Sequence, residues 1–169
     1  MQSSILLRSQ EIQERIKQLS HQIDEYYRER NFTAIVVYNG ALFFAADLLK
    51  GCSSLCEIIG VHASSYYGGF EAAGDVTFTG ILDVKDKHIL IIDDVYDTGN
   101  TLYALSNELY DKGASTVEIC VLLTKEVIKN KVVDVLFNGF TIPNKFVFGY
   151  GLDIKNKYRN LKDILVYEQ

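Results

Sequence analysis

The sequence predicts an α/β protein in which helices cover both faces of a doubly wound, mainly parallel sheet. Short runs of apolar, largely β-branched residues recur along the chain, and their lack of alternation indicates strands buried on both faces. Between these runs, apolar residues return every three or four positions, which is the spacing of amphipathic helices. Strand, helix and strand in succession form the crossover unit of parallel sheets.

The first helix is expected over residues 9–27, where one stripe is apolar and the outer face is polar. The strand 34–38 turns directly into an apolar helix over 41–50, and the strand 88–92 is followed by a helix that ends at Gly113. The remaining strands are expected at 55–62, 76–82 (returning as a hairpin arm), 116–123 and 132–140, with short apolar segments at 146–149 and 164–167.

The length predicts a single domain over residues 1–169. Its core is expected at about 34–140, and the chain ends, at about 1–10 and 141–169, are expected to form a small hood. The sequence contains no repeats, linkers or low-complexity segments.

Composition excludes several classes of protein. The net charge of −5 argues against nonspecific nucleic-acid binding, for which a basic face is expected. The longest apolar run, 41–49, is interrupted by Asp47 and is too short to span a membrane. The cysteines (Cys52, Cys56 and Cys120) lack metal-site spacing and, with no signal-peptide pattern at the amino end, indicate reduced thiols in a cytoplasmic protein.

The stretch 88–102, HILIIDDVYDTGNTL, concentrates the residues suited to chemistry. An apolar strand is followed by Asp93 and Asp94, then by Asp97, and a Thr/Gly loop then opens the next helix. The acids are therefore expected at the carboxyl end of a strand. In open α/β sheets, ligands bind at that edge.

The order of these residues restricts the ligand. Free N–H groups, hydroxyls and the positive end of a helix dipole suit a phosphate, and they come from Thr98, Gly99, Asn100 and Thr101. Carboxylates repel phosphate, so Asp93 and Asp94 must face another part of the ligand, and a ribose diol offers them two donors. The pattern suggests a ribose 5-phosphate group; a carboxylate cluster for a metal ion is the alternative.

The segment IIDDVYDTGNTL resembles the phosphoribosyl-pyrophosphate (PRPP) motif of type I phosphoribosyltransferases, in which an apolar strand, two acids and two further residues precede Asp-Thr-Gly-x-Thr. Other segments resemble the hypoxanthine-guanine branch of that family: SSY at 64–66, LLTK at 122–125, FTIPNKFV at 140–147, and GYGLD with KYRNL within 149–161. The resemblance covers about residues 36–161.

The resemblance implies roles for the PRPP-binding residues. Asp93 and Asp94 bind the ribose, and Asp97 with the loop 98–101 binds the 5′-phosphate. Asp97 is also the candidate to exchange a proton with purine N7, and capping of the helix is the alternative role for this residue. Pyrophosphate is assigned to Asn39, Gly40 and Arg159, the mobile loop to Ser64, Ser65 and Tyr66, and a magnesium ion (Mg²⁺) to Asp153, Asp93 and Asp94.

Four residues are implied to bind the purine: Lys125, Phe146, Val147 and Asp153. The ammonium group of Lys125 donates to a 6-oxo group but not usefully to the 6-amino group of adenine. The ring of Phe146 offers a flat face for the base, and the main chain of Val147 reads its edge. Without the resemblance, Phe146 reads as a core residue, and a solvated lysine at a strand end is the alternative for Lys125.

The implied activity is purine salvage. The 5-phosphoribosyl group passes from PRPP to N9 of hypoxanthine or guanine with the help of Mg²⁺, giving IMP or GMP and pyrophosphate. A closed loop keeps water from C1′ during transfer. The expected partners are these small molecules, with no nucleic acid or membrane, in a homodimer or homotetramer.

Two residues depart from the family pattern. Asn39 stands where the family usually has lysine, beside a position that often forms a cis, non-proline peptide. This replacement bears on pyrophosphate affinity and on an oligomer contact. Asp93 stands where the branch more often has Glu, which is one methylene longer and chemically equivalent.

Two alternatives stay open at this stage. One is a phosphoribosyltransferase that prefers xanthine, because selectivity at the purine 2-position depends on main-chain contacts around Val147 and Asp153. The other is a non-catalytic PRPP-binding regulator on the same fold. The acidic net charge, the absence of an added helix-turn-helix segment and the presence of Asp97, Lys125 and Phe146 argue against the regulator.

Overall fold

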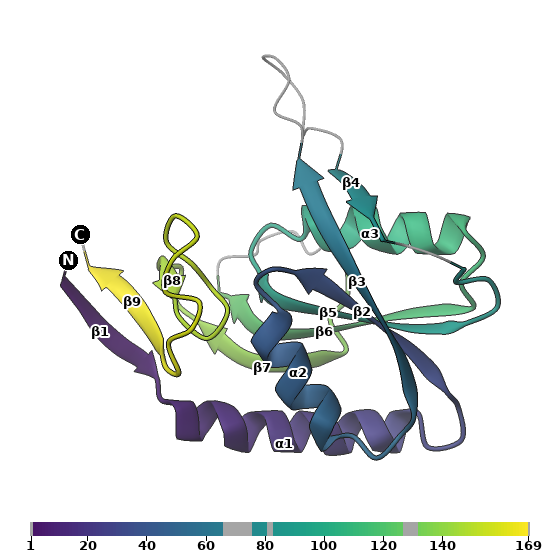
Figure 1. Cartoon of the computed structure of the whole chain (residues 1–169), viewed down its shortest axis with the longest axis horizontal. Helices are drawn as coiled ribbons and strands as arrows, with labels where there is room; N and C mark the ends of the chain where they lie inside the picture. Colours follow the sequence, from purple (N-terminus) through teal and green to yellow (C-terminus); the bar gives the residue numbers. More distant parts are fainter. Residues whose placement is uncertain (1, 66–75, 81–82, 127–131, 169) are drawn as a thin grey trace.

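The structure is a computed structural model that describes residues 2–65, 76–80, 83–126 and 132–168. Its main sheet has the strand order β4-β3-β2-β5-β6-β7 (Figure 1). Only the edge strand β4 runs antiparallel to its neighbour, and the other pairs are parallel, which confirms the predicted fold class. These strands are β2 (Phe32–Tyr38), β3 (Cys56–Ser65), β4 (Val76–Thr79), β5 (His88–Tyr96), β6 (Thr116–Lys125) and β7 (Phe137–Ile142).

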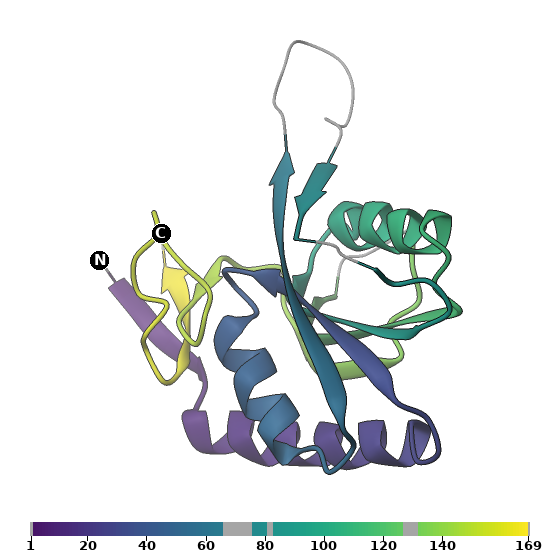
Figure 2. The ribbon, with the colours of Figure 1, turned by 45° about the vertical axis from the view of Figure 1, so that its right-hand side comes forward.

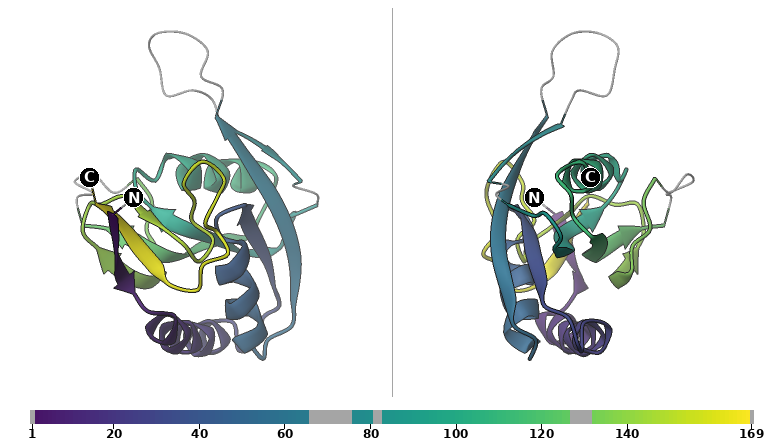
Figure 3. Two further views of the ribbon diagram at one scale, coloured as in Figure 1. Left: turned by 60° about the vertical axis from the view of Figure 1, so that its left-hand side comes forward. Right: turned by 90° about the vertical axis from the view of Figure 1, so that its right-hand side faces the viewer.

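Helices cover both faces of this sheet (Figure 3). α1 (Ser9–Tyr26) and α2 (Leu42–Gly51) pack on one face, and α3 (Asn100–Asp111) packs on the other. Successive residues of β2 and of β5 enter different cores, so that Leu90 lies with α1 and α2 while Ile91 lies with α3. This arrangement explains the continuous apolar runs of the strands, because both faces are buried.

The two ends of the chain form a second, three-stranded sheet with the order β1-β9-β8. β1 (Gln2–Leu7) and β9 (Ile164–Glu168) pair antiparallel, and β9 also pairs with the short β8 (Val147–Phe148). Both termini therefore lie side by side (Figure 1), in the small hood that the sequence predicts. Among the described helices, none has the length and hydropathy that crossing a membrane requires.

Several strands end later than their apolar pattern predicts. β5 continues through the acidic residues to Tyr96, because its ladder with β6 extends to the pair Tyr96–Thr124. Asp93 and Asp94 therefore lie within β5, near the carboxyl end where they were expected, although the apolar run itself ends at Ile92. β3 likewise continues to Ser65 by pairing with β4, and the ends of this hairpin rise beyond the neighbouring strands (Figure 2). β7 starts only at Phe137, later than predicted.

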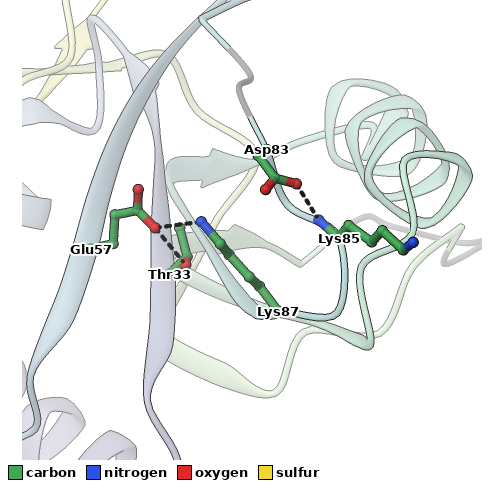
Figure 4. A network of polar contacts seen from close by, with 5 residues as sticks. All are labelled: Thr33, Glu57, Asp83, Lys85 and Lys87. Carbon is green, nitrogen blue, oxygen red and sulfur yellow. Dashed lines mark hydrogen bonds and ion pairs between the residues drawn. The ribbon is translucent and has the colours of Figure 1, made fainter.

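A polar network joins three segments at the amino ends of the central strands (Figure 4). Lys87 Nζ donates to Glu57 Oε2 over 2.7 Å, and the Thr33 hydroxyl donates to the same oxygen over 3.4 Å. The hydrogen bond from Lys87 and its charge hold the pKa of Glu57 below its usual range. These contacts tie β2, β3 and the start of β5 together at the edge opposite the acidic residues.

Candidate active site

The carboxyl ends of β2, β5 and β6 meet at one edge of the sheet, because adjacent parallel strands share their direction. The turn at Asn39 and Gly40 follows β2, the acid pair lies near the end of β5, and Lys125 is the last residue of β6. Candidate residues from three separate parts of the sequence are thus brought to the same edge.

The acid pair is removed from solvent. Asp93 is 7% exposed, and its Oδ1 accepts a hydrogen bond of 2.9 Å from the Asp94 N–H. Burial raises the pKa of Asp93 well above its usual value, and the neighbouring Asp94 charge adds to this effect. Burial also raises the pKa of Asp94, against the opposing influence of its hydrogen bonds and of Arg159. A ligand that brings hydroxyl donors or a cation here would stabilise the charge.

The Thr/Gly loop lies at the amino end of α3, as predicted. Gly99 is the residue before the helix and has a left-handed φ of 82°. A Cβ at this position would come within 2.3 Å of the Tyr96 ring, so conformation and space both require glycine. A pocket of about 290 Å³ is lined by this loop and by the acids, including Asp93, Asp94, Asp97, Thr98, Gly99 and Thr101. The phosphate-type loop and the acid pair therefore face one cavity.

Asp97 and Lys125 form an ion pair across this site. Their Oδ2 and Nζ atoms are 2.8 Å apart. The side chain of Lys125 is 14% exposed and that of Asp97 is 53% exposed, so the lysine is the more enclosed partner. The pair joins the loop after β5 to the end of β6.

The turn at Asn39 and Gly40 touches the acid pair directly. A Cβ at Gly40 would lie 1.7 Å from Asp94 Oδ2, so no side chain fits at this position. A Cβ at Gly151 would lie 2.1 Å from the Gly40 carbonyl oxygen, so the hood segment packs on the same turn. The peptide bond between Tyr38 and Asn39 is cis, as the resemblance implies for this turn.

Asp153 and Arg159 form an ion pair of 2.8 Å in the hood. Asp153 also accepts a hydrogen bond of 2.6 Å from the Asn156 N–H, and Arg159 donates to the Gly151 carbonyl over 2.6 Å. Arg159 lies close enough to Asp94 to oppose the rise of its pKa. The sequence assigns Asp153 and Arg159 separate roles, whereas the structure couples them to each other and to the turn.

The remaining candidates lie at two other places. Phe146 is 57% exposed, so it is not a core residue, and Val147 beside it is buried in β8. Ser64 and Ser65 were expected in a loop, but their backbone forms the end of β3. Tyr66 lies outside the described residues.

The predicted metal ligands Asp93, Asp94 and Asp153 do not form one cluster. In the described part of the chain, no three histidine, cysteine, aspartate or glutamate side chains gather in a way that could hold a metal ion. The residues fit a divalent cation only where a bound ligand supplies further oxygen atoms. Mg²⁺ commonly binds in this way, through one or two carboxylates and substrate phosphates.

Sequence reasoning assigned no role to Tyr150 or Asp47. Tyr150 lies between Gly149 and Gly151, and its hydroxyl donates to Asp47 Oδ2 over 2.6 Å. The available signal was the charge of Asp47 inside an otherwise apolar helical run, for which the helix itself offers no reason.

Comparisons with known proteins agree with this geometry. The family model described as the phosphoribosyl transferase domain matches residues 2–155. The hypoxanthine-guanine-xanthine phosphoribosyltransferase of Tritrichomonas foetus is 34% identical over 98% of this chain and 91% of its own length.

Solved structures give the same result. A hypoxanthine-guanine phosphoribosyltransferase from Bacillus anthracis superimposes with a TM-score of 0.90 at 30% identity, covering 98% of both chains. The Trypanosoma cruzi hypoxanthine phosphoribosyl transferase, solved to study how its C-terminal region affects oligomeric state and enzymatic activity, has a TM-score of 0.90 at 29% identity, covering 98% of this chain and 91% of that one. The chain belongs to the phosphoribosyl transferase family.

Proposed function

We propose that this protein transfers the 5-phosphoribosyl group of PRPP to N9 of hypoxanthine or guanine, with release of pyrophosphate. The observation that carries the proposal is one pocket lined both by the acid pair and by Thr98, Gly99 and Thr101 of the loop. A ribose 5-phosphate group requires both halves of that pocket. The carboxylates accept hydrogen bonds from the ribose diol, and the N–H groups of the loop donate to the phosphate. The choice of a purine as the acceptor base is supported by the names of the relatives, which are hypoxanthine-guanine or hypoxanthine-guanine-xanthine phosphoribosyltransferases.

The residues have distinct tasks in this proposal. Asp93 and Asp94 accept hydrogen bonds from the ribose hydroxyls, and the amino end of α3 binds the 5′-phosphate. Lys125 donates to the 6-oxo group of the base, and the exposed ring of Phe146 stacks on it. Asp97 exchanges a proton with N7 as the purine N9 attacks C1′ and the bond to pyrophosphate breaks.

The pyrophosphate end of PRPP is assigned to the turn at Asn39 and Gly40 and to Arg159. These segments are in contact through Gly151, which accepts a hydrogen bond from Arg159 and packs against Gly40. Asp153 on one side and the acid pair on the other would hold Mg²⁺ together with substrate oxygens. When bound, this ion neutralises the negative charge that develops on the leaving pyrophosphate.

A spectrophotometric assay with PRPP and Mg²⁺ against hypoxanthine, guanine, xanthine and adenine tests the proposal. We expect turnover of hypoxanthine or guanine and none of adenine, because adenine offers no 6-oxo acceptor to Lys125. Adenine turnover at a comparable rate would contradict the assignment of Lys125. Measurable PRPP binding without turnover of any base would contradict the enzymatic function.

Xanthine is the second candidate base. The T. foetus relative is named for hypoxanthine, guanine and xanthine, which favours including it. The same assay separates the candidates: a kcat/KM for xanthine above those for hypoxanthine and guanine would make this a xanthine-preferring enzyme.

We also propose that the protein forms a homodimer or homotetramer. An apolar groove of about 390 Å³ lies between α2 and β3, lined by Tyr38, Leu42 and Ile58 among others. Ile58, which lines this groove, is 58% exposed. Light scattering coupled to size exclusion should give a mass at least twice that of the chain. Ile58→Asp should reduce this mass to that of a monomer. Leu136→Asp, at an exposed leucine that does not line the groove, should leave the mass unchanged. A monomeric wild type would refute the proposal.

A further inference from the structure

Tyr150 connects the hood to the helix that starts at the pyrophosphate turn. Its side chain is 6% exposed, and its hydroxyl donates to Asp47 Oδ2 over 2.6 Å. Asp47 lies in α2, which begins directly after the turn at Asn39 and Gly40. Gln13 of α1 completes the contact by donating to the same carboxylate oxygen over 2.8 Å.

The backbone around Tyr150 has a conformation that needs support. Gly149, Tyr150 and Gly151 have φ values of 94°, 50° and 102°, so three successive residues are left-handed. Two of them are glycines, which adopt this conformation without penalty, whereas tyrosine does not. A residue held in an unfavourable conformation persists only where surrounding contacts determine it. The side chain of Tyr150 supplies such contacts, in the core and at its hydroxyl.

The segment that Tyr150 holds carries the groups assigned to pyrophosphate and Mg²⁺. The Gly151 N–H donates to the Arg159 carbonyl over 2.8 Å, and the Arg159 guanidinium donates back to the Gly151 carbonyl over 2.6 Å. Arg159 in turn pairs with Asp153. A shift of Gly151 therefore moves Arg159 and Asp153 together, and it also opens the close contact with Gly40.

We propose that Tyr150 is a positioning residue: its hydrogen bond to Asp47 holds the segment Gly149–Asp153 against the turn at Gly40 and so sets the geometry of the pyrophosphate end of the site. This inference rests on the proposed function. It also gives a reason for the charge of Asp47 within the apolar helix α2. Burial and the adjacent Asp47 carboxylate raise the pKa of Tyr150, so its hydroxyl remains a donor.

The test removes one oxygen atom. In Tyr150→Phe, we expect the KM for PRPP and the inhibition constant for pyrophosphate to rise about 10-fold, while the KM for hypoxanthine changes less than about 2-fold. The matched control is Tyr26→Phe, because the Tyr26 hydroxyl also donates to a carboxylate, Glu118 Oε1, over 2.8 Å but joins α1 to β6 instead. This control should leave both Michaelis constants unchanged.

Substitutions at Asp47, the partner of Tyr150, test the same hydrogen bond if Tyr150→Phe fails to fold. Asp47→Asn keeps an oxygen that accepts from Tyr150 and should keep most of the wild-type PRPP affinity, whereas Asp47→Leu should behave like Tyr150→Phe. Equal rises in the Michaelis constants for both substrates, or an unchanged KM for PRPP, would overturn the positioning role.

Hydrogen–deuterium exchange separates this inference from the proposed function, because it needs no substrate. Backbone amides of residues 149–161 and 39–45 should exchange about 10-fold faster in Tyr150→Phe than in wild type, with no such change in Tyr26→Phe. Exchange rates in Tyr150→Phe that equal those of wild type would overturn the positioning role of Tyr150. Absence of turnover in wild type would instead refute the proposed function, while the exchange result would still decide whether Tyr150 holds the segment.

Discussion

Lys125 donates from its ammonium group to Asp97 Oδ2 over 2.8 Å, which joins the end of β6 to the loop after β5. An ammonium group has three donors, so Lys125 can keep this bond while donating to another acceptor. The two residues proposed to bind N7 and the 6-oxo group, which are neighbours on one edge of the purine ring, therefore orient each other. A change in either one is expected to affect the other.

Asp97→Asn should lower kcat by about 100-fold or more, because the amide cannot exchange a proton with purine N7. The KM for PRPP should stay within about 3-fold of wild type, since the loop 98–101 and the acid pair supply most phosphate and ribose contacts. Steady-state kinetics with both substrates check this. Asp86→Asn, at the opposite edge of the sheet, serves as the control; wild-type turnover in Asp97→Asn would remove the proton-transfer role.

Lys125→Ala should raise the KM for hypoxanthine about 10-fold or more, because a charged hydrogen bond to the 6-oxo group is lost. The matched control is Lys87→Ala, since Lys87 forms an ion pair of similar length with Glu57 far from the site. The control should change stability but not the Michaelis constants. An effect of Lys125→Ala that is confined to PRPP would show that this lysine does not contact the base.

Asn39→Lys restores the charge that is usual in the family at this turn. We expect the KM for PRPP or the inhibition constant for pyrophosphate to fall about 3- to 10-fold, because a cation beside the diphosphate strengthens its binding. Asn31→Lys adds the same charge at the other edge of the sheet and should have no such effect. An effect on purine kinetics alone would argue against placing pyrophosphate at this turn.

The sequence predicted the helices and the strands of the main sheet well, because each carries its own pattern of apolar residues, but it predicted no strand at β1. It predicted strand ends poorly, since Asp93 interrupts the apolar run and its strand continues only because β6 lies beside it. That neighbour is distant in the sequence. Local patterns therefore locate a strand, whereas its length depends on the pairing partner.

In the candidate site, too, the sequence predicted the arrangement of residues that are close along the chain but not the contacts between distant segments. Asp93, Asp94 and the loop 98–101 lie in one continuous segment, so their spacing alone predicted that they share a pocket. The contact of Gly151 with Gly40 joins residues that lie far apart in the sequence. No local sequence pattern predicts such a contact. The ion pair between Asp153 and Arg159 was likewise not predicted from the sequence and is seen only in the structure.

Ser106→Ala should stabilise the protein. The Ser106 hydroxyl is buried in α3 and, in the described part of the chain, has no hydrogen-bond partner. Removing an unpaired buried polar group should raise the free energy of unfolding by about 0.5–1 kcal/mol and the melting temperature by about 1–4 °C. The control is Ser20→Ala, because the Ser20 hydroxyl is buried within 2.9 Å of the Leu48 carbonyl oxygen. The control should lower the melting temperature; a lower value in Ser106→Ala would contradict the prediction.

Asp24 should make the stability of the protein depend on pH in the acidic range. Burial alone would raise its pKa, but hydrogen bonds from the Ser53 hydroxyl and from the N–H groups of Ser53 and Ser54 outweigh burial and lower the pKa from 3.8 to about 2. Because the pKa is lower in the folded state, the stabilisation is complete above pH 3.8 and is lost as the pH falls toward 2.

Asp24→Asn should therefore reduce the free energy of unfolding at pH 7 by about 1–2 kcal/mol, with allowance for partial exposure of the carboxylate. The difference from wild type should shrink as the pH falls from 4 to 2, because wild-type Asp24 is then protonated. Urea denaturation at a series of pH values measures both quantities, with the exposed Asp86→Asn as the control. A difference that persists unchanged at pH 2 would show that the charge of Asp24 is not what stabilises the link between α1 and the segment after α2.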